Sequence, residues 1–118
     1  PFVDANRIGI WGWSYGGYIK LMSMSTLNSP FKAGVAVAPV TDWKFYDTIY
    51  GERFMRTPQE NFEGYKSSSA FTRVNNLQGE ANKSFKIQAY PNRNHGIYGG
   101  NTRHHLFTQL TEFFLKNL

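Results

Sequence analysis

The chain places a serine between two glycines in the stretch Gly12-Trp13-Ser14-Tyr15-Gly16. Residues 7–11 before it form a short apolar run typical of a strand, and residues 17–24 after it have helical character. A serine on such a strand-to-helix turn takes a strained backbone conformation that exposes its Oγ. The spacing therefore predicts that Ser14 is a nucleophile.

The same turn would supply a hydrogen-bond donor. The backbone N–H of Tyr15, at the start of the helix, points to where a negatively charged oxygen would form during attack by Ser14. Tyr15 is therefore the candidate for one oxyanion-hole donor, and a second donor is still required. The alternative is a chance match in a glycine-rich turn, but the flanking elements and a downstream histidine favour the catalytic interpretation.

That histidine is His95, which follows a strand-like segment over residues 85–90 in a loop that ends in glycines. A loop at the carboxyl end of a strand is where an α/β hydrolase presents its general base. We predict that His95 is this base; the alternative is a surface histidine bonded to a loop carbonyl. His104 and His105 are neighbours on a predicted helix, so they diverge by about 100° and cannot share a metal ion. We expect both on the surface.

These residues need a strand, a helix and a second strand to position them. The first strand is predicted over about residues 8–12, and the helix ends before residues 28–30. Residues 31–40 are largely apolar, as in a parallel strand that is covered on both faces. Together they predict one βαβ unit. The apolar residues on the buried side of the helix are Tyr18, Leu21, Met22, Met24 and Leu27.

The remainder of the chain predicts three more helices. A short helix within residues 42–50 would place its aromatic residues on one face, and a second is predicted over residues 70–76. A final helix would be capped by Asn101 or Thr102. Its core side would carry Leu106, Leu110, Phe113 and Phe114.

Composition limits the classes of protein that fit. A chain of 118 residues suits one domain, and 17% aromatic residues favour a packed interior or an aromatic pocket. The net charge is +5, but the 13 basic residues are scattered, so nucleic-acid binding is not expected. The absence of cysteine excludes disulfides and thiolate metal sites. No apolar run approaches the roughly 18 residues of a membrane span. A chain that begins at Pro1, just before a strand, is expected to be part of something longer.

Four stretches together resemble the dipeptidyl peptidase IV-like branch of the prolyl oligopeptidase family of serine peptidases. They are the serine turn of residues 12–16, which is called a nucleophile elbow, with Gly17-Tyr18 after it, the segment Ala38-Pro39-Val40, an aromatic segment from Trp43 to Met55, and His95-Gly96-Ile97-Tyr98. The resemblance spans nearly the whole chain. It implies an α/β fold, with residues 1–118 forming one partial α/β-hydrolase catalytic domain: a parallel sheet flanked by helices, with a nucleophile elbow. The family's N-terminal β-propeller would be absent.

The resemblance also implies roles for individual residues. Ser14 would be the nucleophile, His95 the base and the Tyr15 N–H an oxyanion donor, with no metal and no cofactor. A small apolar pocket would take a proline or alanine side chain, because aromatic walls lie flat against a pyrrolidine ring. The pocket residues would be Tyr15, Val40, Trp43, Tyr46 and Tyr50. The alternative is that these aromatic residues are only core, and for Trp43 the two interpretations are equally weighted.

The implied reaction is release of N-terminal dipeptides that carry proline or alanine in the second position. A peptide would be the substrate, and the parent family is often homodimeric. A periplasmic, secreted or membrane-anchored location is favoured over a cytoplasmic one. Two alternatives stay open: another α/β hydrolase, such as an esterase or acyl-peptide hydrolase, and an inactive pseudoenzyme or interaction fragment.

One departure from the family is substantial. Similar proteins have a further strand, and a loop with the catalytic aspartate, where this chain runs directly from Glu80 to Ala81. Either this segment is truly deleted, or the protein has residues between Glu80 and Ala81 that this sequence omits. Glu80 is the nearest substitute acid in sequence. Loss of the oriented triad acid lowers the kcat of a serine protease about ten thousandfold, so we expect the chain alone to be weak or inactive. About three strands would remain, and their exposed edges would favour self-association.

Overall fold

The centre of the fold is a pair of parallel strands, β1 (Gly9–Trp13) and β2 (Ala33–Val37), paired in register along their full lengths. The computed structural model describes residues 2–78 and 86–118. The chain crosses from β1 to β2 through helix α1 (Tyr15–Met24). The predicted βαβ unit is therefore confirmed.

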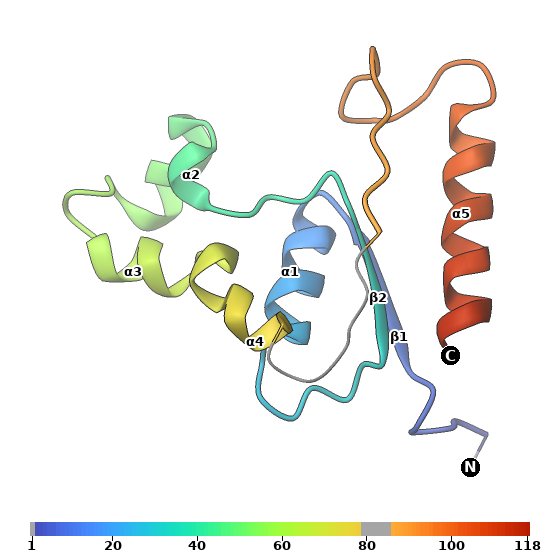
Figure 1. Ribbon diagram of the computed structural model, residues 1–118. Coiled ribbons are helices and arrows are strands. Elements are labelled where there is room, and N and C mark those ends of the chain that lie inside the picture. The colour runs from blue at the N-terminus through green and yellow to red at the C-terminus, as the bar shows by residue number, and fades with distance from the viewer. Residues whose placement is uncertain (1, 79–85) are drawn as a thin grey trace.

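Helices cover both faces of the strand pair. In Figure 1, α1 lies on one side of the strands and α5 (Thr102–Asn117) lies on the other. The final helix predicted from the sequence is confirmed, and Leu106 on its core side is buried. Asn101 occupies the N-cap position as expected, but its side chain makes no capping hydrogen bond. Within the described residues, no helix is long and apolar enough to cross a membrane.

An arm of short helices extends from α1 on the side away from the strands (Figure 1). The arm consists of η1 (Trp43–Phe45), α2 (Thr48–Met55), α3 (Phe62–Ser67), η2 (Ala70–Arg73) and α4 (Val74–Gln78). The single short helix predicted within residues 42–50 is two helices, because Asp47 Oδ1 accepts a hydrogen bond of 2.8 Å from the Tyr50 N–H and starts α2. Helix α3 was not predicted. Asn61 Oδ1 caps it by accepting a hydrogen bond of 3.2 Å from the Gly64 N–H.

The arm is joined to α1 by a buried aromatic cluster of Tyr18, Trp43 and Tyr65. The Tyr18 hydroxyl donates to the Ser68 carbonyl oxygen at 3.0 Å, so this buried polar group keeps a partner. Helix α1 is therefore covered on one side by the strands and on the other by the arm. Leu27, predicted on the buried side of this helix, lies beyond its end and is exposed, since α1 ends at Met24.

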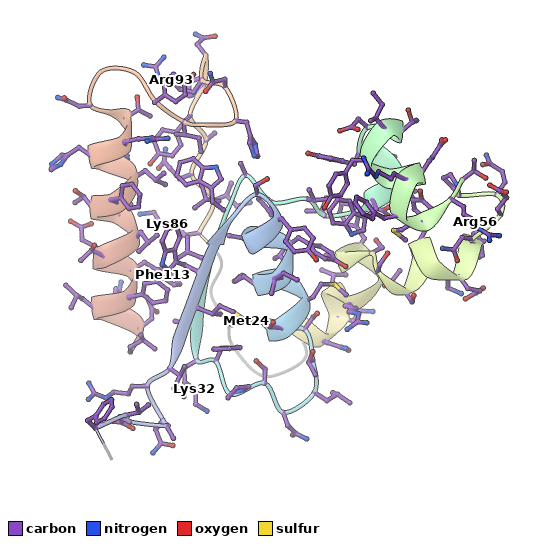
Figure 2. The ribbon with its side chains drawn as sticks, turned by 180° about the vertical axis from the view of Figure 1, so that it is seen from behind. Met24, Lys32, Arg56, Lys86, Arg93 and Phe113 are labelled. Carbon is purple, nitrogen blue, oxygen red and sulfur yellow. The ribbon has the colours of Figure 1, made fainter. Side chains whose placement is uncertain are left out.

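The predicted strand over residues 85–90 is wrong for the part that the structure describes. Phe85 lies outside the described residues, and residues 86–90 join no ladder. The described chain therefore has two strands and not three. A groove of about 580 Å³ lies between β2, residues 86–90 and α5, and Figure 2 shows Lys86 and Phe113 in this region. Lys20 lines the groove from α1, and burial lowers the pKa of its ammonium group.

Candidate active site

Ser14 lies on a strained turn between β1 and α1. Its backbone has φ 56° and ψ −117°, a region that non-glycine residues rarely occupy. The Ser14 N–H donates to the Val37 carbonyl oxygen at 2.9 Å, and the Ser14 carbonyl oxygen accepts from the Tyr18 N–H at 3.0 Å. The structure therefore has the strained strand-to-helix turn that the sequence predicts, with the serine backbone held from both sides.

The two glycines of the motif have different steric roles. A Cβ at Gly12 would collide with the backbone carbon and oxygen of Gly16, so β1 and α1 could not approach as they do. A Cβ at Gly16 would meet nothing within 4 Å. Only the first glycine is sterically required by the turn.

Tyr15 is the first residue of α1, so its N–H has no acceptor within the helix. The positive end of the helix dipole lies at the same place. This N–H can therefore donate to an oxyanion formed by attack of Ser14, and its role in an oxyanion hole stays a prediction.

His95 is exposed and lies in the loop before α5, beside the elbow. The Trp13 indole Nε1–H donates to the His95 carbonyl oxygen at 3.0 Å, which links the loop to the residue that precedes Ser14. Among the residues that the structure describes, no hydrogen bond joins the His95 ring to Ser14 Oγ. Catalytic hydrogen bonds are often long without substrate, so His95 remains the candidate base.

The acidic residues near the pocket have structural partners. Asp42 is buried; its Oδ2 accepts from Ser69 Oγ at 2.8 Å and its Oδ1 from the Lys44 N–H at 3.0 Å. Asp47 caps α2. Glu80 lies outside the described residues. Within residues 2–78 and 86–118, no carboxylate is hydrogen-bonded to the His95 ring, so the structure supplies no triad acid.

The predicted pocket residues gather around Trp43. Its ring centroid lies 5.9 Å from that of Tyr15, 5.6 Å from that of Tyr46 and 5.5 Å from that of Tyr50. Val40 packs against the same cluster. Trp43 itself is buried, with 7% of its surface exposed, whereas the three tyrosines are partly exposed. Trp43 is therefore core that supports the tyrosines, and the tyrosines are the surface available to a ligand.

The remaining histidines lie on α5. Both His104 and His105 are exposed, as expected, and the His105 Nδ1 is hydrogen-bonded to the Tyr90 hydroxyl at 2.9 Å. Burial raises the pKa of that hydroxyl. In the described part of the chain, no three His, Asp or Glu side chains gather in a way that could hold a metal ion.

Arg103 lies beside the loop of the candidate base and was not predicted from the sequence. Arg103, in the first turn of α5, donates from its guanidinium to the Gly96 carbonyl oxygen. It also lies over the rings of Trp13 and Tyr98. The contact with Trp13 joins α5 to β1, segments that are far apart in the chain, so no local pattern could have indicated it.

Parallel strands joined through a strained serine elbow, with a helix on each face, define part of an α/β-hydrolase fold. The family model described as "Prolyl oligopeptidase family" matches residues 1–84. The chain therefore belongs to the prolyl oligopeptidase family of peptidases.

Individual relatives agree with this assignment. A probable dipeptidyl-aminopeptidase B of Neurospora crassa is 36% identical over 144 residues, which cover 98% of this chain and 16% of the relative. Dipeptidyl peptidase 4 of Felis catus is 35% identical over 141 residues, covering 95% of this chain and 18% of the relative. The crystal structure of Porphyromonas gingivalis dipeptidyl peptidase 4 is 48% identical with a TM-score of 0.92, over 100% of this chain and 20% of that one.

The chain thus spans less than a fifth of the length of these two sequence relatives. Their alignments run over 144 and 141 residues, more than the 118 residues of the chain. The relatives therefore have residues, within the matched region, that have no counterpart here. This agrees with the expectation that a family segment is absent from the sequence.

Proposed function

We propose that this chain holds the nucleophile and the base of a serine peptidase that releases N-terminal dipeptides with proline or alanine in the second position. One observation carries the proposal: Ser14 occupies a strained elbow, and the loop of His95 is hydrogen-bonded to the adjacent Trp13. The dipeptidyl peptidase names of the relatives support the substrate class.

In this reaction Ser14 Oγ attacks the carbonyl carbon of the second residue of the substrate, and the bond from that carbon to the nitrogen of the third residue breaks. His95 takes the hydroxyl proton and then gives it to the leaving amine. The Tyr15 N–H donates to the oxygen that becomes negatively charged. Water then attacks the acyl-enzyme with His95 again as base, and the dipeptide leaves.

The aromatic cluster accounts for the proposed preference for proline or alanine in the second position of the substrate. Tyr15, Tyr46 and Tyr50 present partly exposed ring surface around Trp43, next to the elbow. A pyrrolidine ring or a methyl group can lie against these rings and buries apolar area without leaving a polar group unpaired. A charged side chain would be desolvated there without a partner, which is unfavourable.

We expect slow turnover. No described carboxylate orients the His95 imidazole, and loss of the oriented acid lowers the kcat of a serine protease about ten thousandfold. The rival function is that of an esterase with no dipeptide preference. Comparing a Gly-Pro p-nitroanilide with a p-nitrophenyl ester separates the two, because only the peptidase favours the proline substrate.

Covalent labelling tests the nucleophile directly. After reaction with a fluorophosphonate, the intact mass of the 13.6 kDa chain is expected to increase by one adduct, and Ser14→Ala is expected to abolish this adduct completely. Ser67→Ala is the matched control, because Ser67 is exposed and its hydroxyl donates to the Gly64 carbonyl oxygen of its own helix. An adduct that persists in Ser14→Ala, or its absence from the unmodified chain, would refute the proposal.

For the whole protein we further propose self-association and a periplasmic, secreted or membrane-anchored location. Self-association is supported by the outer edge of β2, which faces the groove and pairs with no strand among the described residues. Analytical ultracentrifugation of the chain over a range of concentrations tests self-association, and fractionation of the source cells tests the location.

A further inference from the structure

Hydrogen bonds within the loop that carries His95 hold its residues to one another. Asn94 Oδ1 accepts from the Gly96 N–H at 3.1 Å, and Asn94 Nδ2 donates to the Tyr98 hydroxyl at 3.0 Å. The Asn94 carbonyl oxygen accepts from the Ile97 N–H at 2.9 Å. The position of the His95 ring therefore depends on how this loop, as a unit, is fixed relative to the elbow.

Two side chains from outside this loop donate hydrogen bonds to two consecutive backbone carbonyl groups of the loop. Trp13 Nε1–H donates to the His95 carbonyl oxygen at 3.0 Å. Arg103 donates to the next one, that of Gly96, from both Nε at 3.3 Å and Nη2 at 3.2 Å. The backbone on each side of Gly96 is thus held from β1 and from α5.

The same two side chains contact each other. The Arg103 guanidinium carbon lies 5.6 Å from the ring centroid of Trp13 and 5.6 Å from that of Tyr98. A planar guanidinium is attracted to aromatic faces at this distance and still directs its N–H groups to an acceptor in its own plane. Trp13 and Arg103 therefore orient each other as well as the loop.

We propose that Trp13 and Arg103 are positioning residues that hold the loop of His95 where its imidazole can reach Ser14 Oγ. The inference rests on the proposed function, in which His95 acts as base. Trp13 is bonded covalently to Ser14, so its hydrogen bond to His95 fixes the base loop one residue away from the nucleophile. No described carboxylate orients the His95 imidazole, so the attachment of the loop backbone to Trp13 and Arg103 is what ties the base to the elbow.

Two substitutions remove the restraint and keep most of the local shape. Arg103→Lys retains the charge and loses the paired donors, and Trp13→Phe retains a ring and loses the indole N–H. Each is expected to slow fluorophosphonate labelling of Ser14 by about ten- to a hundredfold, the scale of a small misplacement of a catalytic group.

Matched controls exist for both variants. Arg93 lies in the outer part of the same loop (Figure 2), and its Nε donates to Thr102 Oγ1 at 3.0 Å without contacting Trp13. Trp11 lies on β1 and packs edge-on against Phe107. Arg93→Lys and Trp11→Phe are expected to change the labelling rate by no more than about twofold.

A double substitution separates positioning from general loss of structure. If Arg103 acts through His95, then Arg103→Lys is expected to cause no further slowing in a His95→Gln background. Additive slowing in that background would overturn the proposal. Equal effects of Arg103→Lys and Arg93→Lys would overturn it too.

A second readout does not depend on activity. Hydrogen exchange of the Trp13 indole N–H, followed by NMR of ¹⁵N-labelled protein, is expected to become about tenfold faster in Arg103→Lys and to stay unchanged in Arg93→Lys. If the fluorophosphonate does not label the unmodified chain, the proposed function is wrong. The exchange rate of the Trp13 indole N–H then tests the attachment of the His95 loop by itself. Unchanged exchange in Arg103→Lys would then overturn it.

Discussion

Replacing Gly12 with alanine is expected to lower the free energy of unfolding by more than about 3 kcal/mol, beyond the usual range for overpacking. The new Cβ would collide with the backbone carbon and oxygen of Gly16, in the first turn of α1. Backbone atoms cannot rotate away as a side chain can, so α1 must separate from β1. That movement also removes the support of the strained Ser14 conformation.

Replacing Gly16 with alanine is expected to raise the free energy of unfolding. A Cβ there meets nothing within 4 Å, and the residue lies in α1, where alanine is favoured over glycine by up to about 1 kcal/mol. Gly16→Ala is thus an internal control with identical chemistry in the same motif.

Urea unfolding followed by circular dichroism measures both variants, with fluorophosphonate labelling of Ser14 as the functional readout. Gly12→Ala should lose labelling together with stability, and Gly16→Ala should keep both. Similar midpoints for the two variants would show that the close approach of β1 and α1 at Gly12 does not support the elbow.

The elements that the sequence predicted well are those that depend on local pattern. The elbow, the two strands and α5 each follow from apolar periodicity or from motif spacing within a short segment. Residues 85–90 have the alternation of a strand, but a strand also needs a neighbour, and β2 lies across a groove from residues 86–90. Pairing is a non-local property, so alternation alone could not decide it.

The site was predictable to the same extent. Ser14 and Tyr15 follow from one motif, and the structure brings Trp43, Tyr46 and Tyr50 together as the sequence spacing suggested. These three residues were expected on one continuous helix, whereas Asp47 starts a new helix and the rings meet across the junction of η1 and α2. The contact of Arg103 with Trp13 arises only when α5 is placed beside β1, so no sequence spacing encodes it.

Removal of the Trp43 side chain is expected to be the most damaging change in the arm. The ring is 7% exposed and lies 5.1 Å from that of Tyr18, centroid to centroid, in the cluster that joins the arm to α1. Truncating a buried tryptophan to alanine costs about 3–5 kcal/mol, because contacts are lost and a cavity remains. Trp43→Ala should therefore detach the arm and abolish any preference for proline substrates.

Phe45 provides the matched comparison, because it is an aromatic residue two positions further along the same short helix, η1. Its side chain is 76% exposed, with the Lys44 ammonium over its ring at 4.9 Å, so Phe45→Ala should change the free energy of unfolding by no more than about 0.5 kcal/mol. Near-ultraviolet circular dichroism and urea midpoints of the two variants measure the difference. If Trp43→Ala retained the midpoint of Phe45→Ala, Trp43 would be a replaceable wall of the pocket, and the arm would be held to α1 by Tyr18 and Tyr65 without it.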